Sequence, residues 1–364
     1  MSIRPFKIAI PEAEVADLKA RLARTRWPSA GFDSGWGDGA NLEVMVELVR
    51  RWGSEFSWRD QEARLNRMPQ FLARLDGQDI HFVHVCGEGE APMPLVITHG
   101  WPGSFAEFQD ILPRLTHPSR YGGDPAHAFT VVIPSLPGFG FSPEPALQAA
   151  SPRRTAILWA NLMTALGYNR FALQGGDVGA GVSIWVARLF PDRVAGIHLN
   201  FIPGSYKPPL GPGAAPILGP EQDFLDTVAR WAATDGAYAH LHSTKPQTLA
   251  YALADSPGAL AAWIVEKYQA WTDGGEDLEN AVGIDHLLTT LSLYWFTSAA
   301  GGPLRIYKEG AQAPLAFAEG ERVGPPLSVA LFPKELPMPP LSWVERAFDV
   351  RRWTVMPAGA FRCA

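Results

Sequence analysis

The sequence predicts an α/β fold: a mostly parallel sheet with helices on both faces, interrupted by a helical insertion. Short apolar runs alternate with helical patterns between residues 79 and 201, which is the rhythm of a doubly wound parallel sheet. Residues 221–298 then show helical patterns only. Strand patterns return at residues 328–332 and 352–355. A helical segment inserted into one α/β core explains this order.

The N-terminal part, residues 1–78, is expected to be a helical extension. Pro11 suits the first position of a helix over Glu12 to Arg24, which has acidic residues in its first turn and arginines in its last. A second helix is expected after Asn41. Its inward-facing residues are expected to be Met45, Leu48, Val49 and Trp52.

The rest of the chain divides into three further segments. We assign the first part of the α/β core to residues 79–204, the helical insertion to 205–298 and the second part of the core to 299–364. Within the core, strands are expected at residues 80–85, 95–99, 130–134, 171–174 and 194–201, with helices at 154–166 and 179–189.

Composition excludes several classes of function. The 31 Lys and Arg residues against 37 Asp and Glu give a formal charge of −6, which disfavours nucleic acid as a partner. We see no apolar stretch long enough for a membrane anchor and no signal-peptide pattern at the start, so we expect a cytoplasmic protein. The two cysteines cannot build a disulfide framework, and we expect neither a metal nor a cofactor.

The first candidate for chemistry is Gly175-Gly-Asp177-Val-Gly179, which lies between a predicted strand and a predicted helix. In that context, the motif predicts a nucleophile elbow: glycines permit the tight turn that presents the central side chain at the carboxyl edge of the sheet. Here the central residue is Asp177. An ionised carboxylate can attack an sp³ carbon that bears a leaving group, without a base, to form an ester on the enzyme.

The second candidate is the loop Thr98-His-Gly-Trp-Pro-Gly-Ser104, which follows another predicted strand. Such a loop can offer a backbone N–H toward the nucleophile, and the Val178 N–H would be the second donor of an oxyanion hole. We expect His99 to order the loop rather than act as a base.

Together, these two motifs resemble those of the epoxide hydrolases of the microsomal type, which have an α/β-hydrolase fold. Arg4-Pro-Phe-Lys7 and Arg24-Thr-Arg-Trp-Pro28 are similar to the N-terminal segment of that family. The similarity continues through Tyr238-Ala-His, Ser243-Thr-Lys-Pro246, Ala254-Asp-Ser-Pro257, Leu293-Tyr-Trp295, Arg305-Ile-Tyr307 and Phe332-Pro-Lys-Glu335, so it covers nearly the whole chain.

The resemblance implies a hydrolase core with a helical cap, and a reaction that adds water to an epoxide to give a vicinal diol. It also implies a role for each matching residue. Asp177 resembles the nucleophile, Tyr238 and Tyr307 the two phenols that hold the epoxide oxygen, and Glu335 the acid that orients the general base. Trp101 and Val178 would supply the oxyanion-hole amides, and the Trp101–Pro102 peptide bond is expected to be cis.

The C-terminal end departs from the family pattern. There the core ends with Gly-Gly-His-Phe and a last helix, and this histidine activates water against the ester. This chain reads Met356-Pro-Ala-Gly-Ala-Phe-Arg-Cys-Ala364, and no histidine follows His286. We therefore expect an intact first half-reaction and slow ester hydrolysis.

A frameshift is our hypothesis for this ending. One permitted codon choice for Gly359-Ala-Phe-Arg-Cys-Ala364 reads Gly-His-Phe-Ala-Ala from its second nucleotide. A short deletion in a guanine-rich run would then produce the observed residues. The alternative is a real early stop, and sequencing the gene across these codons decides between the two.

Three other functions are weighed against the epoxide hydrolase. A dehalogenase with an aspartate nucleophile shares the elbow, but it usually has Trp after that Asp and a halide cradle, so Val178 and the paired tyrosines argue against it. A non-catalytic protein of the same fold that binds a hydrophobic ligand stays open, whereas a Ser-type esterase is disfavoured by Asp177. The expected partner is a small hydrophobic epoxide, in detoxification or secondary metabolism, and a homo-oligomer is left open.

Overall fold

The computed structural model describes residues 2–29, 35–145, 150–203, 206–210 and 215–359. The proposed frameshift and the altered ending after Gly359 therefore lie outside the described residues. The strands are β1 Ile3–Phe6, β2 Gln70–Leu75, β3 Gln78–Val85, β4 Met93–Thr98, β5 Phe129–Pro134, β6 Phe171–Gly175, β7 Val194–Leu199, β8 Val323–Leu331 and β9 Phe348–Val355.

Helices of very different lengths connect these strands. The α-helices are α1 Glu12–Leu22, α2 Leu42–Ser54, α3 Trp58–Leu65, α4 Leu112–Thr116, α5 Pro152–Ala165, α6 Asp177–Leu189, α7 Gly219–Thr234, α8 Ala237–Thr244, α9 Pro246–Asp255, α10 Pro257–Ala270, α11 Leu278–Val282, α12 Ile284–Phe296, α13 Gly302–Gln312 and α14 Leu341–Ala347. Short 3-10 helices lie at Phe105–Phe108, Pro118–Tyr121, Pro125–His127 and Pro191–Arg193.

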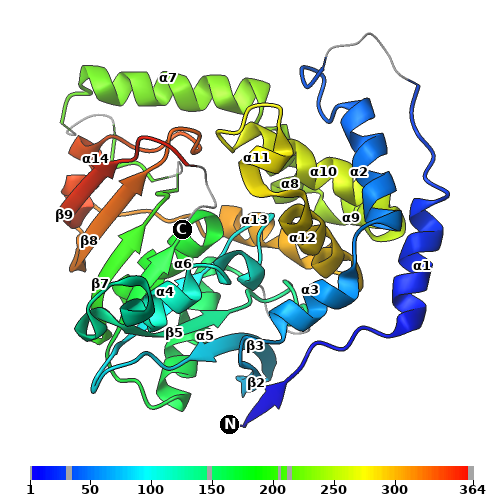
Figure 1. Ribbon diagram of the computed structural model, residues 1–364. Coiled ribbons are helices and arrows are strands. Elements are labelled where there is room, and N and C mark those ends of the chain that lie inside the picture. Colours follow the sequence, from blue (N-terminus) through cyan, green and yellow to red (C-terminus); the bar gives the residue numbers. More distant parts are fainter. Residues whose placement is uncertain (1, 30–34, 146–149, 204–205, 211–214, 360–364) are drawn as a thin grey trace.

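The strands form one nine-stranded sheet in the order β1-β2-β3-β5-β4-β6-β7-β8-β9. Strands β5, β4, β6, β7, β8 and β9 are parallel to one another, whereas the pairs β1–β2, β2–β3 and β3–β5 are antiparallel. Helices cover both faces of the sheet (Figure 1). The α/β-hydrolase fold expected from the sequence is confirmed, and its parallel strands bring the ends of β4 and β6 to one edge.

The expectation of a helical N-terminal extension is correct for α1, α2 and α3 but wrong at β1 and β2. Strand β1 is short and mostly exposed, and β2 has the buried polar Gln70 at its start, so neither shows the alternation of a half-buried strand. A hairpin joins β2 to β3 through Asp76 and Gly77, which both have positive φ. Asp-Gly is a strong hairpin signal, so this turn could have been predicted from the sequence.

Helices α1 and α2 begin almost as expected. Pro11 is the residue before α1 rather than its first residue, and Asn41 caps α2 by accepting a hydrogen bond from the Val44 N–H at 3.1 Å. The four inward-facing residues predicted for α2 are all buried. Helices α1 and α2 pack on α10, and α3 packs on α12.

Helices α7 to α12 form the insertion between β7 and β8, and α13 follows them before the sheet resumes. In Figure 1, α7 runs across the top and α8 to α13 lie between the sheet and α2. Helix α13 packs against α8, so these two helices face each other beside the sheet edge. The division into extension, core and cap stays our proposal.

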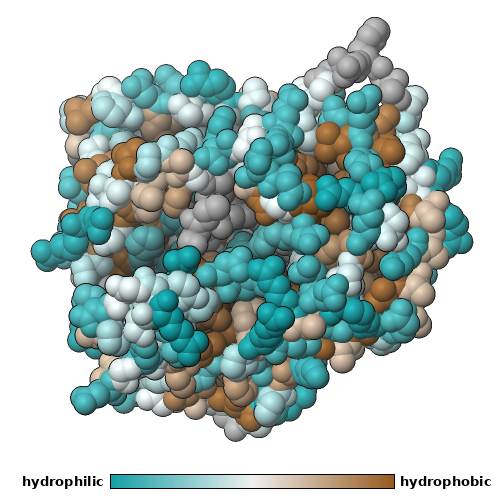
Figure 2. Space-filling view, viewed as in Figure 1, coloured by the Kyte–Doolittle hydropathy of each residue, from teal (hydrophilic) through white to brown (hydrophobic). Residues whose placement is uncertain are grey.

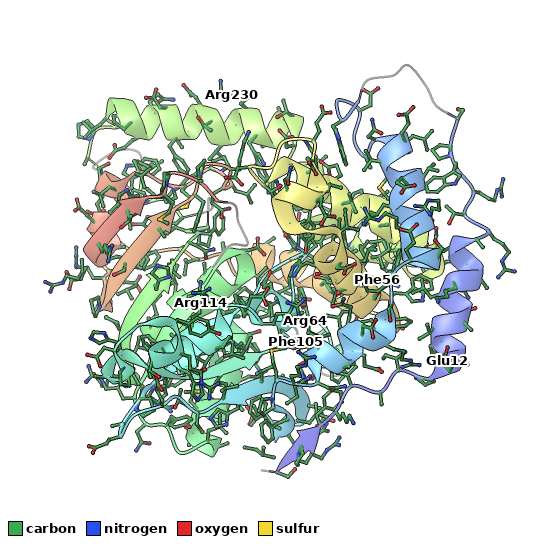
Figure 3. All side chains as sticks on the ribbon, in the orientation of Figure 1. Glu12, Phe56, Arg64, Phe105, Arg114 and Arg230 are labelled. Atoms are coloured by element: carbon green, nitrogen blue, oxygen red, sulfur yellow. The ribbon has the colours of Figure 1, made fainter. Side chains whose placement is uncertain are left out.

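The interior is apolar and the surface is mostly polar. Phe105 lies in the interior, whereas Arg230 on α7 points away from the body of the molecule (Figure 3). Figure 2 shows a largely hydrophilic face with apolar residues interspersed. In the part of the chain that the structure describes, no single helix is long and apolar enough to cross a membrane. Helices α9 and α10 reach the required length and hydropathy only when they are taken together, and the chain bends by 117° between them.

Candidate active site

Asp177 lies at the turn from β6 into α6. It is the first residue of α6, and its φ of 48° is in the left-handed region that non-glycine residues seldom adopt. Its side chain is 7% exposed. The N-terminus of a helix carries partial positive charge, which favours an ionised carboxylate there. This strand–turn–helix geometry is that of a nucleophile elbow.

Two glycines allow the close approach around Asp177. A Cβ atom on Gly179 would collide with the carbonyl oxygen of Thr98, so only glycine lets α6 start against the end of β4. A Cβ atom on Gly100 would collide with the Asp177 carboxylate. The backbone after β4 is therefore in contact with the side chain presented by the elbow.

That backbone contact is polar. The Trp101 N–H donates a hydrogen bond of 2.8 Å to Asp177 Oδ1, and the Trp101–Pro102 peptide bond is cis, as expected from the sequence. An amide in this position remains beside the oxygen when the carboxylate becomes an ester. Val178 lies next to Asp177 in the cavity wall, and its amide as the second donor stays a prediction.

Buried hydrogen bonds hold this loop. The Leu136 N–H donates to His99 Nε2 at 3.2 Å, so Nδ1 carries the ring proton and points it at the Gly100 carbonyl, 3.1 Å away. His99 is thus an ordering residue, as its position in the sequence suggests. The Tyr294 hydroxyl on α12 donates to the Gly103 carbonyl at 3.0 Å, which ties the loop to the helical insertion.

Two further tyrosines face each other beside this loop. Tyr238 on α8 and Tyr307 on α13 have ring centroids 6.0 Å apart, in an edge-to-face arrangement. Trp101 contacts both rings, stacked on Tyr238 at 5.4 Å and edge-on to Tyr307 at 6.0 Å. The Tyr307 hydroxyl is buried and has no hydrogen-bond partner among the described residues. A buried hydroxyl without a partner is costly, which favours a ligand as its missing partner.

Both phenols stay protonated at neutral pH. Burial, followed by the charge of Asp177, raises the pKa of Tyr238 and that of Tyr307 well above the ordinary value of 10. A neutral phenol is a hydrogen-bond donor and a potential acid. The two phenols and the carboxylate are therefore close enough to influence one another's charge.

Glu335 lies in the loop after β8. Its Oε1 accepts a hydrogen bond from the Leu336 N–H at 2.8 Å, while its enclosed Oε2 has no partner among the described residues. Burial raises the pKa of Glu335 to about 8, and the charge of Asp177 adds to that effect. The charge of Asp177 therefore acts on Glu335, and the role that the family resemblance implies for Glu335 stays a prediction.

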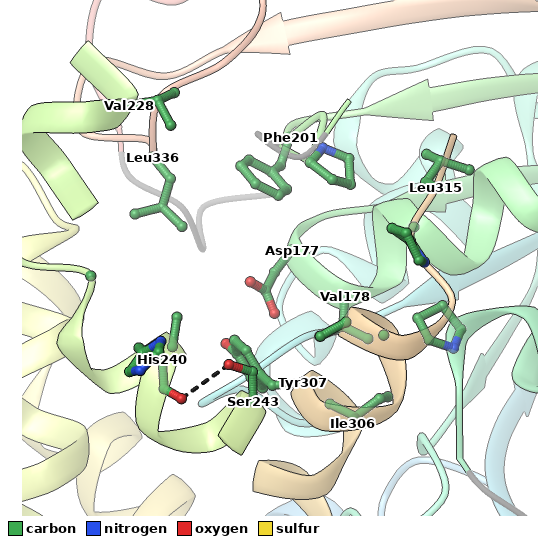
Figure 4. Close-up of a pocket in the computed structure, with 18 of the residues that line it drawn as sticks. Asp177, Val178, Phe201, Val228, His240, Ser243, Ile306, Tyr307, Leu315 and Leu336 are labelled. Carbon is green, nitrogen blue, oxygen red and sulfur yellow. Dashed lines mark hydrogen bonds between the residues drawn. The ribbon is translucent and has the colours of Figure 1, made fainter. Parts of the chain in front are cut away.

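A cavity of about 780 Å³ is lined by Asp177, Tyr238 and Tyr307, among others. In Figure 4, the Asp177 carboxylate points into it from the start of α6, with Val228 and Leu336 across from it. Tyr238 and Tyr307 line the same cavity, and most of the remaining wall is apolar. The polar exceptions include Lys207, His240 and Ser243. An apolar cavity with a few convergent polar groups is typical of a small-molecule site.

Two residues that lie behind the tyrosines, His242 and Lys267, were not predicted from the sequence. His242 is fully buried, with its ring 4.9 Å from that of Tyr307, and Lys267 Nζ lies 4.6 Å from the centre of the Tyr238 ring. His242 lies one helical turn after Tyr238, which is a spacing that could have drawn attention to it. Lys267 comes from α10, and no local signal links it to α8.

Two family models match the chain. The model described as "Epoxide hydrolase N terminus" matches residues 3–108, and the one for the alpha/beta hydrolase fold matches residues 93–297. The chain is 44% identical to a "Putative epoxide hydrolase" of Stigmatella aurantiaca over 95% of its own length and 78% of that protein. It is 36% identical to epoxide hydrolase 1 of Oryctolagus cuniculus over 98% of its length and 84% of the relative.

The chain belongs to the microsomal-type epoxide hydrolases. Solved structures agree: the epoxide hydrolase of Aspergillus niger superposes with a TM-score of 0.85 at 31% identity, covering 99% of this chain and 91% of that one. Juvenile hormone epoxide hydrolase from the silkworm Bombyx mori gives a TM-score of 0.84 at 28% identity, covering 100% and 89%. This enzyme is therefore a hydrolase that acts on the ether bond of an epoxide, and neither the dehalogenase nor the non-catalytic alternative is favoured.

Proposed function

We propose that this epoxide hydrolase works through an ester on Asp177, with the Trp101 and Val178 amides as its oxyanion hole. The observation that carries the proposal is the Trp101 N–H on Asp177 Oδ1 at the elbow, with two buried phenols on the same cavity. The Trp101 amide orients the Asp177 carboxylate at the elbow, where it faces the cavity. Hydrogen-bond donors that are held in place before the reaction contribute a large part of the rate enhancement in enzymes that form and hydrolyse acyl esters.

In the first step, a carboxylate oxygen of Asp177 forms a bond to an epoxide carbon. The bond from that carbon to the ring oxygen breaks, and its electron pair stays on the oxygen as an alkoxide. Tyr238 and Tyr307 hold the ring oxygen by hydrogen bonds, and one phenol gives its proton to the alkoxide. The products of the step are an ester, a neutral hydroxyl group and a phenolate.

The charge of Asp177 couples the two events of this step. That charge raises the pKa of both phenols while the enzyme is free. Esterification neutralises Asp177, so one cause of the raised pKa disappears as the alkoxide develops. The phenols therefore become stronger acids at the moment when the alkoxide needs a proton. This stabilises the transition state more than the ground state.

In the second step, water attacks the ester carbonyl of Asp177. The Trp101 N–H stabilises the oxyanion. We propose that Glu335 is placed to orient a general base for the attacking water, and none of the described residues is assigned as that base. The bond between the acyl carbon and the alcohol oxygen breaks, and that oxygen takes up one of the two water protons to complete the diol. The other proton returns to the phenolate, and the Asp177 carboxylate is regenerated. The enclosed Oε2 of Glu335 supports a hydrogen-bond donor as its partner.

The substrate we propose is a small lipophilic epoxide. A cavity of about 780 Å³ with a mainly apolar wall favours a bulky hydrocarbon substituent over a charged one, because apolar burial supplies the binding energy. We retain the cytoplasm as the expected location and detoxification or secondary metabolism as the expected context.

Diol formation tests these roles. We expect the parent protein to convert styrene oxide into its diol, and Asp177→Asn to lose this activity while keeping its fold, because Asn tolerates a positive φ. The products are separated by chromatography, and circular dichroism checks the fold. Full activity in a stable Asp177→Asn protein that has not hydrolysed back to Asp would overturn the assignment of the nucleophile.

A further inference from the structure

Lys267 is a buried charge that the proposed mechanism does not use. It lies on α10, is 7% exposed, and forms a close ion pair with the neighbouring Glu266. Its Nζ lies 4.6 Å from the centre of the Tyr238 ring and 5.9 Å from that of Trp271. Lysine is almost never fully buried without a reason, because taking an ammonium group out of water is costly.

Helices α10 and α8 meet through two matched pairs of residues. On α8, Tyr238 and His242 are one turn apart, and on α10 the same spacing separates Trp263 and Lys267. The Trp263 indole N–H donates to His242 Nε2 at 3.1 Å, while Lys267 covers the ring of Tyr238. Helix α10 is thus a second layer behind the phenol pair.

His242 does not share the positive charge of this layer. Burial, followed by the charge of Lys267, lowers the pKa of His242 to about 3, so its ring is neutral at physiological pH. Glu266 has a side chain that is 27% exposed, against 9% for Lys267, so water screens its charge more effectively. Burial and the charges of Asp177, Glu335 and Glu266 raise the pKa of Tyr238, and the ammonium group of Lys267 over the face of its ring is the cation that opposes these charges.

We propose that Lys267 stabilises the phenolate form of Tyr238 during epoxide opening, as a positioning residue that acts through Tyr238. The inference rests on the proposed function of Tyr238. When the Tyr238 hydroxyl gives its proton to the alkoxide, the electron pair of its O–H bond remains on Oη, and a negative charge appears in a buried site. A neutral ring attracts a cation weakly, whereas a phenolate attracts it strongly, so Lys267 favours the state after proton transfer.

The arrangement is asymmetric between the two phenols. Lys267 lies over Tyr238, whereas no cation lies over the ring of Tyr307 among the contacts of the described residues. We infer that Tyr238 is the phenol that gives up its proton, and that Tyr307 mainly holds the oxygen. An opposite charge at this range shifts a pKa by about 1–3 units, which corresponds to about 10-fold or more in the ease of proton transfer.

A double-mutant cycle tests the proposal. Single-turnover rates of ester formation with styrene oxide are measured for Lys267→Met in the parent, in Tyr238→Phe and in Tyr307→Phe. We expect Lys267→Met to slow ester formation by about 10- to 100-fold in the parent and in Tyr307→Phe, and by less than about twofold in Tyr238→Phe. Lys267→Arg keeps the charge and should keep most of the rate.

Controls separate charge from packing. Lys19→Met removes an exposed lysine from α1 and should leave the rate unchanged. Glu266→Gln removes the carboxylate but keeps the ammonium, so it should leave the rate unchanged or raise it. A rate lowered by Glu266→Gln would contradict the proposal, and so would an equal effect of Lys267→Met in Tyr238→Phe. If Tyr238→Phe alone forms the ester at the parent rate, the proposed role of Tyr238 fails instead.

Discussion

Replacing each phenol by phenylalanine removes one hydroxyl and keeps its aromatic contacts. In Tyr238→Phe, the ring would still stack on Trp101, and in Tyr307→Phe it would still meet the edge of the same indole. The alkoxide would lose one donor. A hydrogen bond to a charged group is worth about 1.5–3 kcal/mol, so each change should slow ester formation by about 10- to 150-fold. The double variant should be slower by about 10²- to 10⁴-fold.

Stability distinguishes a catalytic phenol from a structural one. The buried Tyr307 hydroxyl has no partner among the described residues, so Tyr307→Phe breaks no described hydrogen bond. Its melting temperature should therefore equal that of the parent or exceed it, while its rate falls. Tyr251→Phe on α9 is the matched control, because Tyr251 is 72% exposed and should affect neither quantity.

Rapid mixing with excess styrene oxide, followed by acid quench and intact-mass measurement, gives the rate of ester formation. Thermal unfolding of the same preparations gives the stability. Two folded single variants that both react at the parent rate would refute the assignment of the phenols. A lower melting temperature in Tyr307→Phe with an unchanged rate would identify a core residue instead.

Three further changes test other parts of the structure. Gly100→Ala places a Cβ against the Asp177 carboxylate and should slow ester formation by about 10²-fold in a folded protein; a parent-like rate would contradict that contact. Trp52→Phe removes a buried hydrogen bond of 2.9 Å to Ser292, between α2 and α12, and should lower the free energy of unfolding in urea by about 1–3 kcal/mol, whereas Trp27→Phe at an exposed position should not. Glu335 has a folded-state pKa of about 8 against an ordinary 4.5, so its protonated form stabilises the folded protein at low pH and this contribution is lost as the pH rises from about 5 to about 8. Glu335→Gln should reduce the fall in the free energy of unfolding between about pH 5 and about pH 8, as measured by urea titration at each pH. The same dependence of this free energy on pH in parent and variant would contradict the burial of this carboxyl.

The elbow and the loop before it could be predicted because their signals are local. Glycines around Asp177, and a Trp-Pro-Gly turn after an apolar strand, restrict the backbone within a few residues. The resemblance to a family added Tyr238, Tyr307 and Glu335, which no local rule singles out. Strand β2 was not predicted because the buried polar Gln70 interrupts the alternation of apolar and polar residues that is typical of a strand. The Asp76-Gly77 turn that follows it was nevertheless present in the sequence.

The layer behind the phenols could not be predicted from residue spacing. Lys267 is one of several polar residues on a largely apolar helix, and its contact with Tyr238 depends on how α10 and α8 are packed. The same holds for Trp263 and His242, which are 21 residues apart and meet only in the folded protein. Hydrophobic periodicity tells which face of a helix is buried but not which side chains meet across the interface.

The ester on Asp177 is the central claim, and peptide mass spectrometry tests it most directly. Parent protein and Asp177→Asn are mixed with styrene oxide, quenched in acid at a series of times, digested and analysed. The account predicts an added mass equal to that of the epoxide on the peptide that contains Asp177, and no such adduct in the variant. The decay of the adduct also measures the rate of ester hydrolysis. Diol formation without an adduct at any time, or an adduct on another residue, would contradict the account.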